Sequence, residues 1–199
     1  FVSKTAIGGQ LFDGMTIAGG GDYFCYLGYV HIGMDSPLKA NAKNFVDSIV
    51  SLGAREVVFL HADCHAMMAK LPEYGVEAPF RAIHVIEYMR DYLKTHPDAI
   101  KPLNRKIAYQ RPCASRYSPE IEPVLDELFQ LIHVERVSRK FDREAARCCG
   151  GLFSRIYPEK MRPMTLENIQ DAVDAGAEAM VFLCPLCMGT LMKAASEKG

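Results

Sequence analysis

The stretch AGAEAMVFLCPLC, residues 175–187, contains the features that decide the fold of this 199-residue chain. An amphipathic run ends near Gly176, a short apolar run with Val181 and Phe182 follows it, and that run leads directly into Cys184. This order predicts a helix over 163–175, a strand over 178–183 and a second helix over 184–198. Alternating strands and helices are typical of parallel sheets flanked by helices, so we expect an α/β fold.

The same pattern occurs once earlier, as LGAREVVFLHADC in residues 52–64. At an offset of 123 residues the two stretches share Gly, Ala, Val, Phe, Leu and the final Cys, and the same offset pairs Cys25 with Cys148. Two similar strands alone would not place the cysteines at one offset. We therefore expect two pseudo-twofold related repeats, each a small parallel sheet flanked by helices, over residues 1–102 and 103–199.

Five of the seven cysteines form three groups separated by equal intervals of 34 residues: Cys113, the pair Cys148 and Cys149, and the pair Cys184 and Cys187. Thiolates are soft ligands that select zinc, copper(I) or iron–sulfur centres. Five thiolates are one more than a tetrahedral zinc ion or a cubane cluster needs. The pattern therefore indicates a metal centre other than an ordinary zinc site.

The predicted strands place these thiols at one edge of a sheet. A strand over 105–110 ends just before Cys113, and the strand over 178–183 ends at Cys184. The carboxyl ends of parallel strands collect ligands, and a helix N-terminus lowers the pKa of a thiol such as Cys184. Gly150 and Gly151 give the backbone freedom for two adjacent cysteines to face one centre. A thioredoxin-like dithiol would explain Cys184 and Cys187 but not the other three cysteines.

The first repeat is degenerate at its thiol positions. His61 stands where Cys184 stands in the second repeat, and Tyr26 stands where Cys149 stands. The counterpart of Cys113 would fall eleven positions before Phe1, and Phe1 is not an initiator methionine, so we expect an N-terminally incomplete first repeat in a fragment or processed product. Cys25, His61 and Cys64, next to Asp63 and His65, form either a second, weaker zinc site or, for Cys25, an unligated core cysteine.

The amino-acid composition argues against several classes of protein. Apolar residues make up 49% of the chain and charged residues 24%, with a net charge of −1, which gives no support to nucleic-acid binding. The longest apolar runs are strand-sized, so we expect no direct membrane span. An odd number of cysteines argues against a secreted disulfide framework, and we expect a cytoplasmic protein, peripheral to a membrane complex at most.

We interpret His84 as a structural histidine in a helical stretch over 82–92. We interpret the basic run 136–147 as a solvated face that could also dock a partner.

The cysteine pattern resembles the CCG cysteine-rich domain, which occurs twice in the B subunit of heterodisulfide reductase. Relatives of that family include iron–sulfur subunits of glycolate and lactate oxidases and an unusual succinate dehydrogenase subunit. The resemblance covers residues 106–193 well and, through the repeat, residues 19–70 more weakly. Gln110 departs from it, because the family often has His at that position.

The resemblance implies a non-cubane [4Fe-4S] cluster held by Cys113, Cys148, Cys149, Cys184 and Cys187, while a degenerate repeat in some relatives holds a single zinc ion. It implies an electron-transfer or disulfide-reducing subunit of a heterodisulfide reductase-like complex, which makes the chain an oxidoreductase subunit. The run 19–21 lacks the spacing of a dinucleotide-binding fingerprint, so we expect electrons to come from subunits that carry flavin or cubane iron–sulfur clusters. A thiol or disulfide is the expected substrate. The alternative is a zinc-stabilised scaffold subunit without redox activity.

Overall fold

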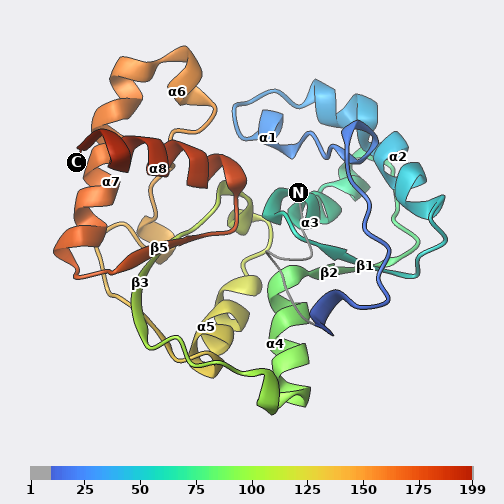
Figure 1. The fold of residues 1–199 in the computed structure, drawn as a ribbon. Helices are drawn as coiled ribbons and strands as arrows, with labels where there is room; N and C mark the ends of the chain where they lie inside the picture. The colour runs from blue at the N-terminus through green and yellow to red at the C-terminus, as the bar shows by residue number, and fades with distance from the viewer. Residues whose placement is uncertain (1–9, 199) are drawn as a thin grey trace.

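A computed structural model describes residues 10–198 as helices around two small parallel sheets (Figure 1). The first sheet pairs β1 (Glu56–Phe59) with β2 (Arg81–His84), and the second has the order β4-β3-β5. In the second sheet, β3 (Arg105–Gln110) lies between β4 (Val134–Arg136) and β5 (Ala179–Phe182), and both pairings are parallel. The predicted α/β fold with small parallel sheets is therefore confirmed.

Helices connect the strands in both halves of the chain. Those of the first half are α1 (Leu27–Val30), α2 (Ser36–Val50), α3 (Ala62–Ala66) and α4 (Val85–Thr95). Those of the second half are α5 (Ile121–Leu131), α6 (Phe153–Ile156), α7 (Pro158–Asp174) and α8 (Pro185–Lys198). Because only two residues separate β1 from α3 and β5 from α8, the residues between strand and helix lie at the carboxyl edge of each sheet.

The bounds of successive elements follow the 123-residue offset found in the sequence. Strand β1 occupies residues 56–59 and β5 occupies 179–182, so the two strands correspond residue for residue. Each is preceded by a long helix, α2 or α7, and each is followed by a helix whose first residues, Ala62 and Pro185, also correspond.

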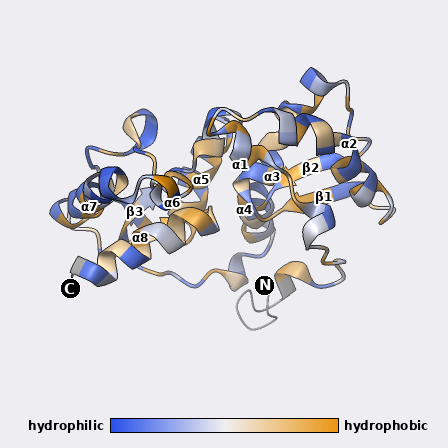
Figure 2. Ribbon diagram, turned by 90° about the horizontal axis from the view of Figure 1, so that it is seen from above, coloured by the Kyte–Doolittle hydropathy of each residue, from blue (hydrophilic) through white to orange (hydrophobic). Residues whose placement is uncertain are grey.

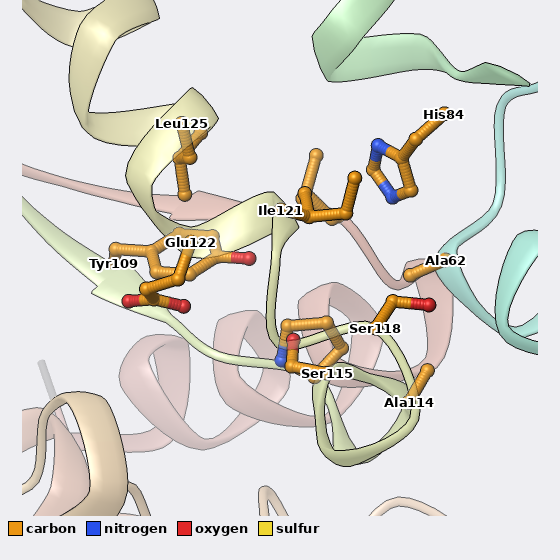
Figure 3. Close-up of a pocket in the computed structure, with 11 residues that line it drawn as sticks. Ala62, His84, Tyr109, Ala114, Ser115, Ser118, Ile121, Glu122 and Leu125 are labelled. Carbon is orange, nitrogen blue, oxygen red and sulfur yellow. The ribbon is translucent and has the colours of Figure 1, made fainter.

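The two halves share part of their hydrophobic core. Helices α4 and α5 lie side by side between the two sheets (Figures 1 and 2). Val85 and Ile86 of α4 pack in one buried cluster with Ile107 and Tyr109 of β3. A small cavity at this junction is lined from both halves, by Ala62 and His84 on one side and by residues of β3, α5 and the loop between them on the other (Figure 3). The two halves therefore meet in a packed junction, while residues 101–104, which link them along the chain, are exposed.

One local prediction was wrong. Residues 82–84 are strand rather than helix, because Ala82 and Ile83 pair with Val57 and Val58 of β1, and α4 begins only after His84. Here a tertiary partner outweighs the local helical pattern.

Candidate metal centre

The five second-half cysteines lie in three loops. Cys113 begins a short 3₁₀ turn directly after β3, and Cys148 and Cys149 lie in the loop before α6. Cys184 lies between β5 and α8, and Cys187 is in the first turn of α8. All seven cysteines of the chain are free thiols, so each sulfur is available as a ligand.

These thiols neighbour one another in a chain of contacts. Cys149 and Cys187 are 3% exposed and pack in one apolar cluster, against which the partly buried Cys184 also packs. Cys113 interacts with Cys148, which interacts with Cys149, and Cys187 joins Cys149 to Cys184. Of the five, Cys148 is exposed, Cys113 and Cys184 are half-buried, and Cys149 and Cys187 are buried. The three sequence groups therefore meet in space.

Interactions between these thiols lower the pKa of some of them and raise the pKa of others. The neighbouring Cys113 thiol lowers the pKa of Cys148 far below its ordinary value. The neighbouring Cys187 thiol, assisted by His61, lowers the pKa of Cys184 to about 4 against the opposing effect of burial. Cys148 in turn raises the pKa of Cys149 to about 12. Thiolate, the form that binds metals, is thus favoured at Cys148 and Cys184.

The glycines after the cysteine pair contribute both hydrogen bonds and space. The backbone N–H of Gly150 donates to the Cys148 sulfur at 3.4 Å, and that of Gly151 donates to the Cys149 sulfur at 3.4 Å. Hydrogen bonds to sulfur are one of the factors that set the potential of iron–sulfur clusters. A β-carbon at Gly151 would stand 2.7 Å from Cγ of Leu186, so this loop approaches the Cys184–Cys187 loop only because position 151 lacks a side chain.

A buried polar network holds the loop before Cys148. Gln110 at the end of β3 is 1% exposed, and its Nε2 donates to the Arg147 carbonyl at 2.9 Å. Asn168 of α7 donates to Oε1 of Gln110 at 2.7 Å, and its own Oδ1 accepts from Arg139 at 2.8 Å. The departure from the family pattern at position 110 thus has a structural role. Its partner is 58 residues away, and no local pattern in the sequence could have identified it.

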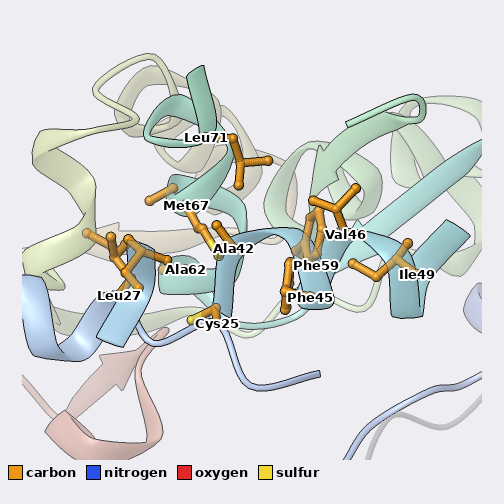
Figure 4. Packing of buried hydrophobic residues seen from close by; sticks show 13 residues of the cluster. Cys25, Leu27, Ala42, Phe45, Val46, Ile49, Phe59, Ala62, Met67 and Leu71 are labelled. Carbon is orange, nitrogen blue, oxygen red and sulfur yellow. The ribbon is translucent and has the colours of Figure 1, made fainter. Parts of the chain in front are cut away.

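The first half contains a more compact group of potential ligands. The ligand atoms of Cys25, His61 and Cys64 all lie within 4.8 Å of one another, and the Cys64 sulfur is 3.8 Å from Nδ1 of His61. Cys25 is buried at the edge of the first-half core (Figure 4). A single tetrahedral ion with bonds of about 2.3 Å holds its ligand atoms about 4 Å apart. The group is therefore sized for one ion, and the five second-half thiols form no such compact group within the described residues.

The chemistry of this group also suits a metal. The neighbouring Cys64 thiol lowers the pKa of Cys25 to about 6, although burial opposes it. Burial disfavours the charged imidazole of His61, but Cys184, Cys25 and Asp63 outweigh it and raise the pKa to about 10. Nε2 of His61 is buried and has no hydrogen-bond partner. Because a buried polar atom without a partner costs free energy, a group bound here would stabilise the site.

A groove connects this first-half group with the surface. It runs between residues 12–20 and the strand β1, and its lining includes Phe45, Ile49, His61 and Cys64. The groove provides a route by which an ion could reach the imidazole and the thiol.

A polar link between the halves has no counterpart among the sequence predictions. His31 is paired through Nε2 with Asp63 at 3.4 Å, and Arg116, three residues after Cys113, donates to its Nδ1 at 2.9 Å. The bond from Arg116 makes Nδ1 the acceptor, which leaves the ring proton on Nε2, facing the carboxylate. Asp63 is 8% exposed, so this link involves a carboxylate in the interior. His31 follows α1, Asp63 is in α3 and Arg116 is in the 3₁₀ turn after β3, so their spacing in the sequence carries no signal.

Comparison with known proteins identifies the second half. Residues 107–192 match the family profile of the cysteine-rich domain named CCG, which confirms the expected domain. The chain is similar to the D subunit of dihydromethanophenazine:CoB–CoM heterodisulfide reductase from Methanosarcina acetivorans, with 30% identity over 173 residues, 83% of this chain and 41% of the relative. The corresponding D subunit from Methanosarcina barkeri is 28% identical over 172 residues, 82% of this chain and 41% of the relative.

The chain thus spans about two fifths of the length of these relatives. They are D subunits, so the similarity supports homology to the D-type subunits of heterodisulfide reductase without assigning the B-subunit type that the cysteine pattern had led us to expect. Within the described residues, no helix is long and apolar enough to cross a membrane.

Proposed function

We propose that this chain is part of an iron–sulfur redox subunit of a heterodisulfide reductase-like complex, and that it transfers electrons at a centre bound by Cys113, Cys148, Cys149, Cys184 and Cys187. The observation that carries the proposal is the packing of Cys149 against the Cys184–Cys187 loop beyond the end of β5, and the neighbouring position of Cys113 and Cys148 supports it. The similarity to heterodisulfide reductase D subunits supports the same assignment. We also propose that the chain has a role like that of the B subunit of heterodisulfide reductase.

The centre that suits five thiolates is a non-cubane [4Fe-4S] cluster, because a cubane uses four. When bound, such a cluster would supply one-electron chemistry to a thiol or disulfide. The chain's own residues would bind the cluster, expose one side of it and donate hydrogen bonds to its ligands. Cys149 and Cys187 lie in the apolar interior, Cys148 faces solvent where a substrate could approach, and the amides of Gly150 and Gly151 direct hydrogen bonds to sulfur.

We further propose that Cys25, His61 and Cys64 hold a single zinc ion as a second, weaker site. Mixed Cys and His ligands suit tetrahedral zinc, and the three ligand atoms are close enough to share one ion. The division into a degenerate repeat over residues 1–102 and an intact repeat over 103–199 is part of the same proposal, supported by the matching bounds of β1 and β5.

The partners that fit this proposal are redox subunits that carry flavin or cubane iron–sulfur clusters. Gly19 and Gly20 line the surface groove near β1 rather than a strand-to-helix turn of the dinucleotide-binding type. We propose that a separate subunit delivers the electrons and that such partners connect the chain with a membrane complex.

Anaerobic purification with analysis of iron, sulfide and zinc tests the assignment. We expect iron and acid-labile sulfide in the wild-type protein, with loss of both in Cys149→Ser, whereas the matched Cys25→Ser variant should keep iron and lose zinc. Zinc has no accessible redox couple, so a redox titration separates the two metals. Full turnover of Cys149→Ser with the natural redox partner would rule out this centre as the working group.

The second candidate function is a zinc-stabilised scaffold subunit without redox activity. The compact group of Cys25, His61 and Cys64 favours it, because it has the size and chemistry of a structural zinc site. Zinc without iron in anaerobically prepared protein, together with a colourless solution, would select this candidate.

A further inference from the structure

Strand β1 lies at an outer edge of its sheet. Within the described residues it pairs with β2 and with no other strand, and the N–H of Arg81 donates to the carbonyl of Arg55 at 2.8 Å. Backbone groups alternate between the two sides of a strand, so those of Glu56 and Val58 point away from β2. No backbone hydrogen bond joins Glu56 or Val58 to residues 10–20. In the described part of the chain, the outer edge of β1 therefore offers backbone donors and acceptors to a further strand.

A groove of about 590 Å³ follows this edge. Residues 12–20 form one side of it and β1 forms the other, and Phe45 and Ile49 of α2 also line it, close to Phe59 of the strand (Figure 4). Glu56 is the one acidic residue of the lining, which contains no lysine or arginine, and its carboxylate already pairs with Arg81 at 2.9 Å. The groove therefore suits an apolar and uncharged occupant.

The second half shows which element fits beside such an edge. There β5, the equivalent of β1, pairs in parallel with β3, in a register that runs from Ile107 opposite Ala179 to Gln110 opposite Phe182. The 123-residue offset transfers this register to Glu56–Phe59, the whole of β1. Residues 107–110 are all buried, at 0–3% exposure, as is typical of a central parallel strand.

The hydrogen-bonding side of the two strands also agrees. The carbonyl of Ile107 accepts from Val137 of β4 at 2.9 Å, so the neighbours of Ile107 in β3 face β5 and bond to the residue opposite Ile107, which is Ala179. Ala179 is equivalent to Glu56, whose backbone groups face the groove. The side of β5 that β3 occupies thus corresponds to the open side of β1.

We propose that the groove binds an extended apolar segment of a partner polypeptide, which pairs in parallel with the outer edge of β1 as β3 pairs with β5. This inference rests on the internal repeat of the proposed function and on neither of its metal centres. The occupant has four residues of the kind found at 107–110, uncharged and buried on both faces, and its carboxyl end lies toward His61 and Cys64. Backbone pairing supplies the affinity, and the apolar wall of the groove selects the sequence.

A synthetic peptide with the sequence of residues 104–112, NRKIAYQRP, is the probe. We expect saturable binding of the fluorescently labelled peptide to the chain, measured by anisotropy, and weaker binding of a scrambled peptide of the same composition. Amide hydrogen exchange locates the site, since the N–H groups of Glu56 and Val58 should become protected when the peptide binds.

Glu56→Pro tests the backbone pairing. Proline is tolerated at the first residue of a strand, and it removes the N–H that faces the groove. Glu56→Ala is the matched control, because it removes the pair with Arg81 but keeps the N–H. We expect the Kd of the peptide to rise at least about fivefold in Glu56→Pro, as for the loss of one backbone hydrogen bond, and to stay unchanged in Glu56→Ala.

Ile17→Asp tests the apolar wall without disturbing the core, since Ile17 lines the groove and is 62% exposed. Leu103→Asp is its control, because Leu103 is 55% exposed and is not part of the lining. We expect weaker peptide binding in Ile17→Asp alone, and this pair decides the question if Glu56→Pro fails to fold.

Absence of saturable peptide binding, or equal binding by Ile17→Asp and Leu103→Asp, would overturn the proposal. Self-association of the chain that Ile17→Asp abolishes, without peptide binding, would also overturn it and assign the groove to a second copy. Analysis of iron and zinc is independent of these results. A metal-free chain that binds the peptide would refute the proposed function and leave the strand-binding groove standing.

Discussion

Gly151 is the residue whose missing side chain has the most direct consequence for the centre. A β-carbon there would stand 2.7 and 2.8 Å from two atoms of Leu186 and 3.4 Å from the Cys149 sulfur. Leu186 lies between Cys184 and Cys187, so any displacement of Leu186 moves the loop that carries both thiols. The glycine therefore sets the distance between two of the three cysteine loops.

We expect Gly151→Ala to lower the free energy of unfolding by about 1–3 kcal/mol, as is typical of overpacking, and to reduce the iron content. Gly189→Ala is the control, because a β-carbon at Gly189 in α8 meets nothing within 4 Å, and alanine stabilises a helix. Urea unfolding and metal analysis of both variants check this. Equal iron content in the two would show that the close approach to Leu186 has no role in binding.

His84 illustrates how one buried histidine can control acid stability. It is 2% exposed, its Nδ1 accepts a hydrogen bond from the Ile86 backbone at 3.1 Å, and its backbone N–H donates to Glu87 at 3.0 Å. We predicted a structural role for His84 from the sequence, and in the structure the residue caps the N-terminus of α4. Burial, with a smaller effect from nearby His65, lowers the pKa of His84 from 6.5 to about 4. The folded protein therefore keeps this ring neutral where the unfolded chain would protonate it.

Because the pKa of His84 is lower in the folded protein than in the unfolded chain, the neutral ring stabilises the folded protein fully above pH 6.5. This contribution to the free energy of unfolding is lost as the pH falls from 6.5 toward 4. From pH 7 to pH 5 the loss from this group is about 2 kcal/mol. His84→Asn keeps a capping acceptor without a titratable ring, so its free energy of unfolding should fall less over this interval. His65 and Glu87, the titratable groups near the ring, are unchanged in the variant. If the free energy of unfolding fell equally with pH in wild type and in His84→Asn, His84 would not be the group responsible.

At the scale of elements, buried arginines hold the second sheet to its helices. Arg136 of β4 has 6% of its side chain exposed and pairs with Glu122 of α5 at 2.6 Å and with Asp142 at 2.6 Å. Arg139 has 1% exposed and pairs with Asp171 of α7 at 3.2 Å. The interpretation of this basic run as a solvated face was wrong for these two residues, because carboxylates from α5, from α7 and from the run itself pair with the charges and allow them to be buried.

Gln110 and Asn168 connect β3, α7 and the loop before Cys148. We expect Asn168→Ala to cost about 1–3 kcal/mol, since it removes the donor to Oε1 of Gln110 and one of the acceptors of Arg139, and to weaken iron binding by loosening the cysteine loop. Asn44→Ala, an exposed asparagine on the equivalent helix α2, is the control. Thermal unfolding with iron analysis measures both effects, and a wild-type iron content in Asn168→Ala would show that the network does not position the loop.

At the scale of the whole molecule, the two halves are joined by one apolar cluster. Leu125 of α5 is 2% exposed and lies in the cluster that contains Val85 and Ile86 of α4, and Val58 of β1 packs against the same cluster. Arg90 and Lys94 of α4 also pair with Glu127 of α5 at 3.0 and 2.8 Å, but these exposed pairs add little. The shared core predicts that the halves unfold together.

We expect Leu125→Ala to lower the free energy of unfolding by about 2–5 kcal/mol through the cavity it creates. Hydrogen exchange of β1 and of β5 should accelerate together, although the substitution lies in the second half. Leu103→Ala is the control, because Leu103 is 55% exposed. Acceleration confined to residues 103–199 would indicate two independently stable domains.

The sequence by itself determined the elements and the order of the thiols. Apolar runs such as 178–183 form strands because they are short, rich in β-branched and aromatic residues, and bounded by Gly-Ala, and a cysteine after such a run must lie at the carboxyl edge of the sheet. The 123-residue offset predicted the correspondence of β1 and β5, since equivalent local patterns produce equivalent elements. These are local properties, so they can be read along the chain.

Only the tertiary structure decided which distant side chains meet. The bond from Arg116 to His31, the bond from Asn168 to Gln110 and the pairing of Arg136 with Glu122 each join residues from separate elements. The local pattern over 82–84 favoured a helix, but pairing with β1 made these residues a strand and turned His84 into a helix cap. Such contacts depend on how whole sheets and helices pack, and the free energy of that packing outweighs the small differences in local propensity that a sequence displays.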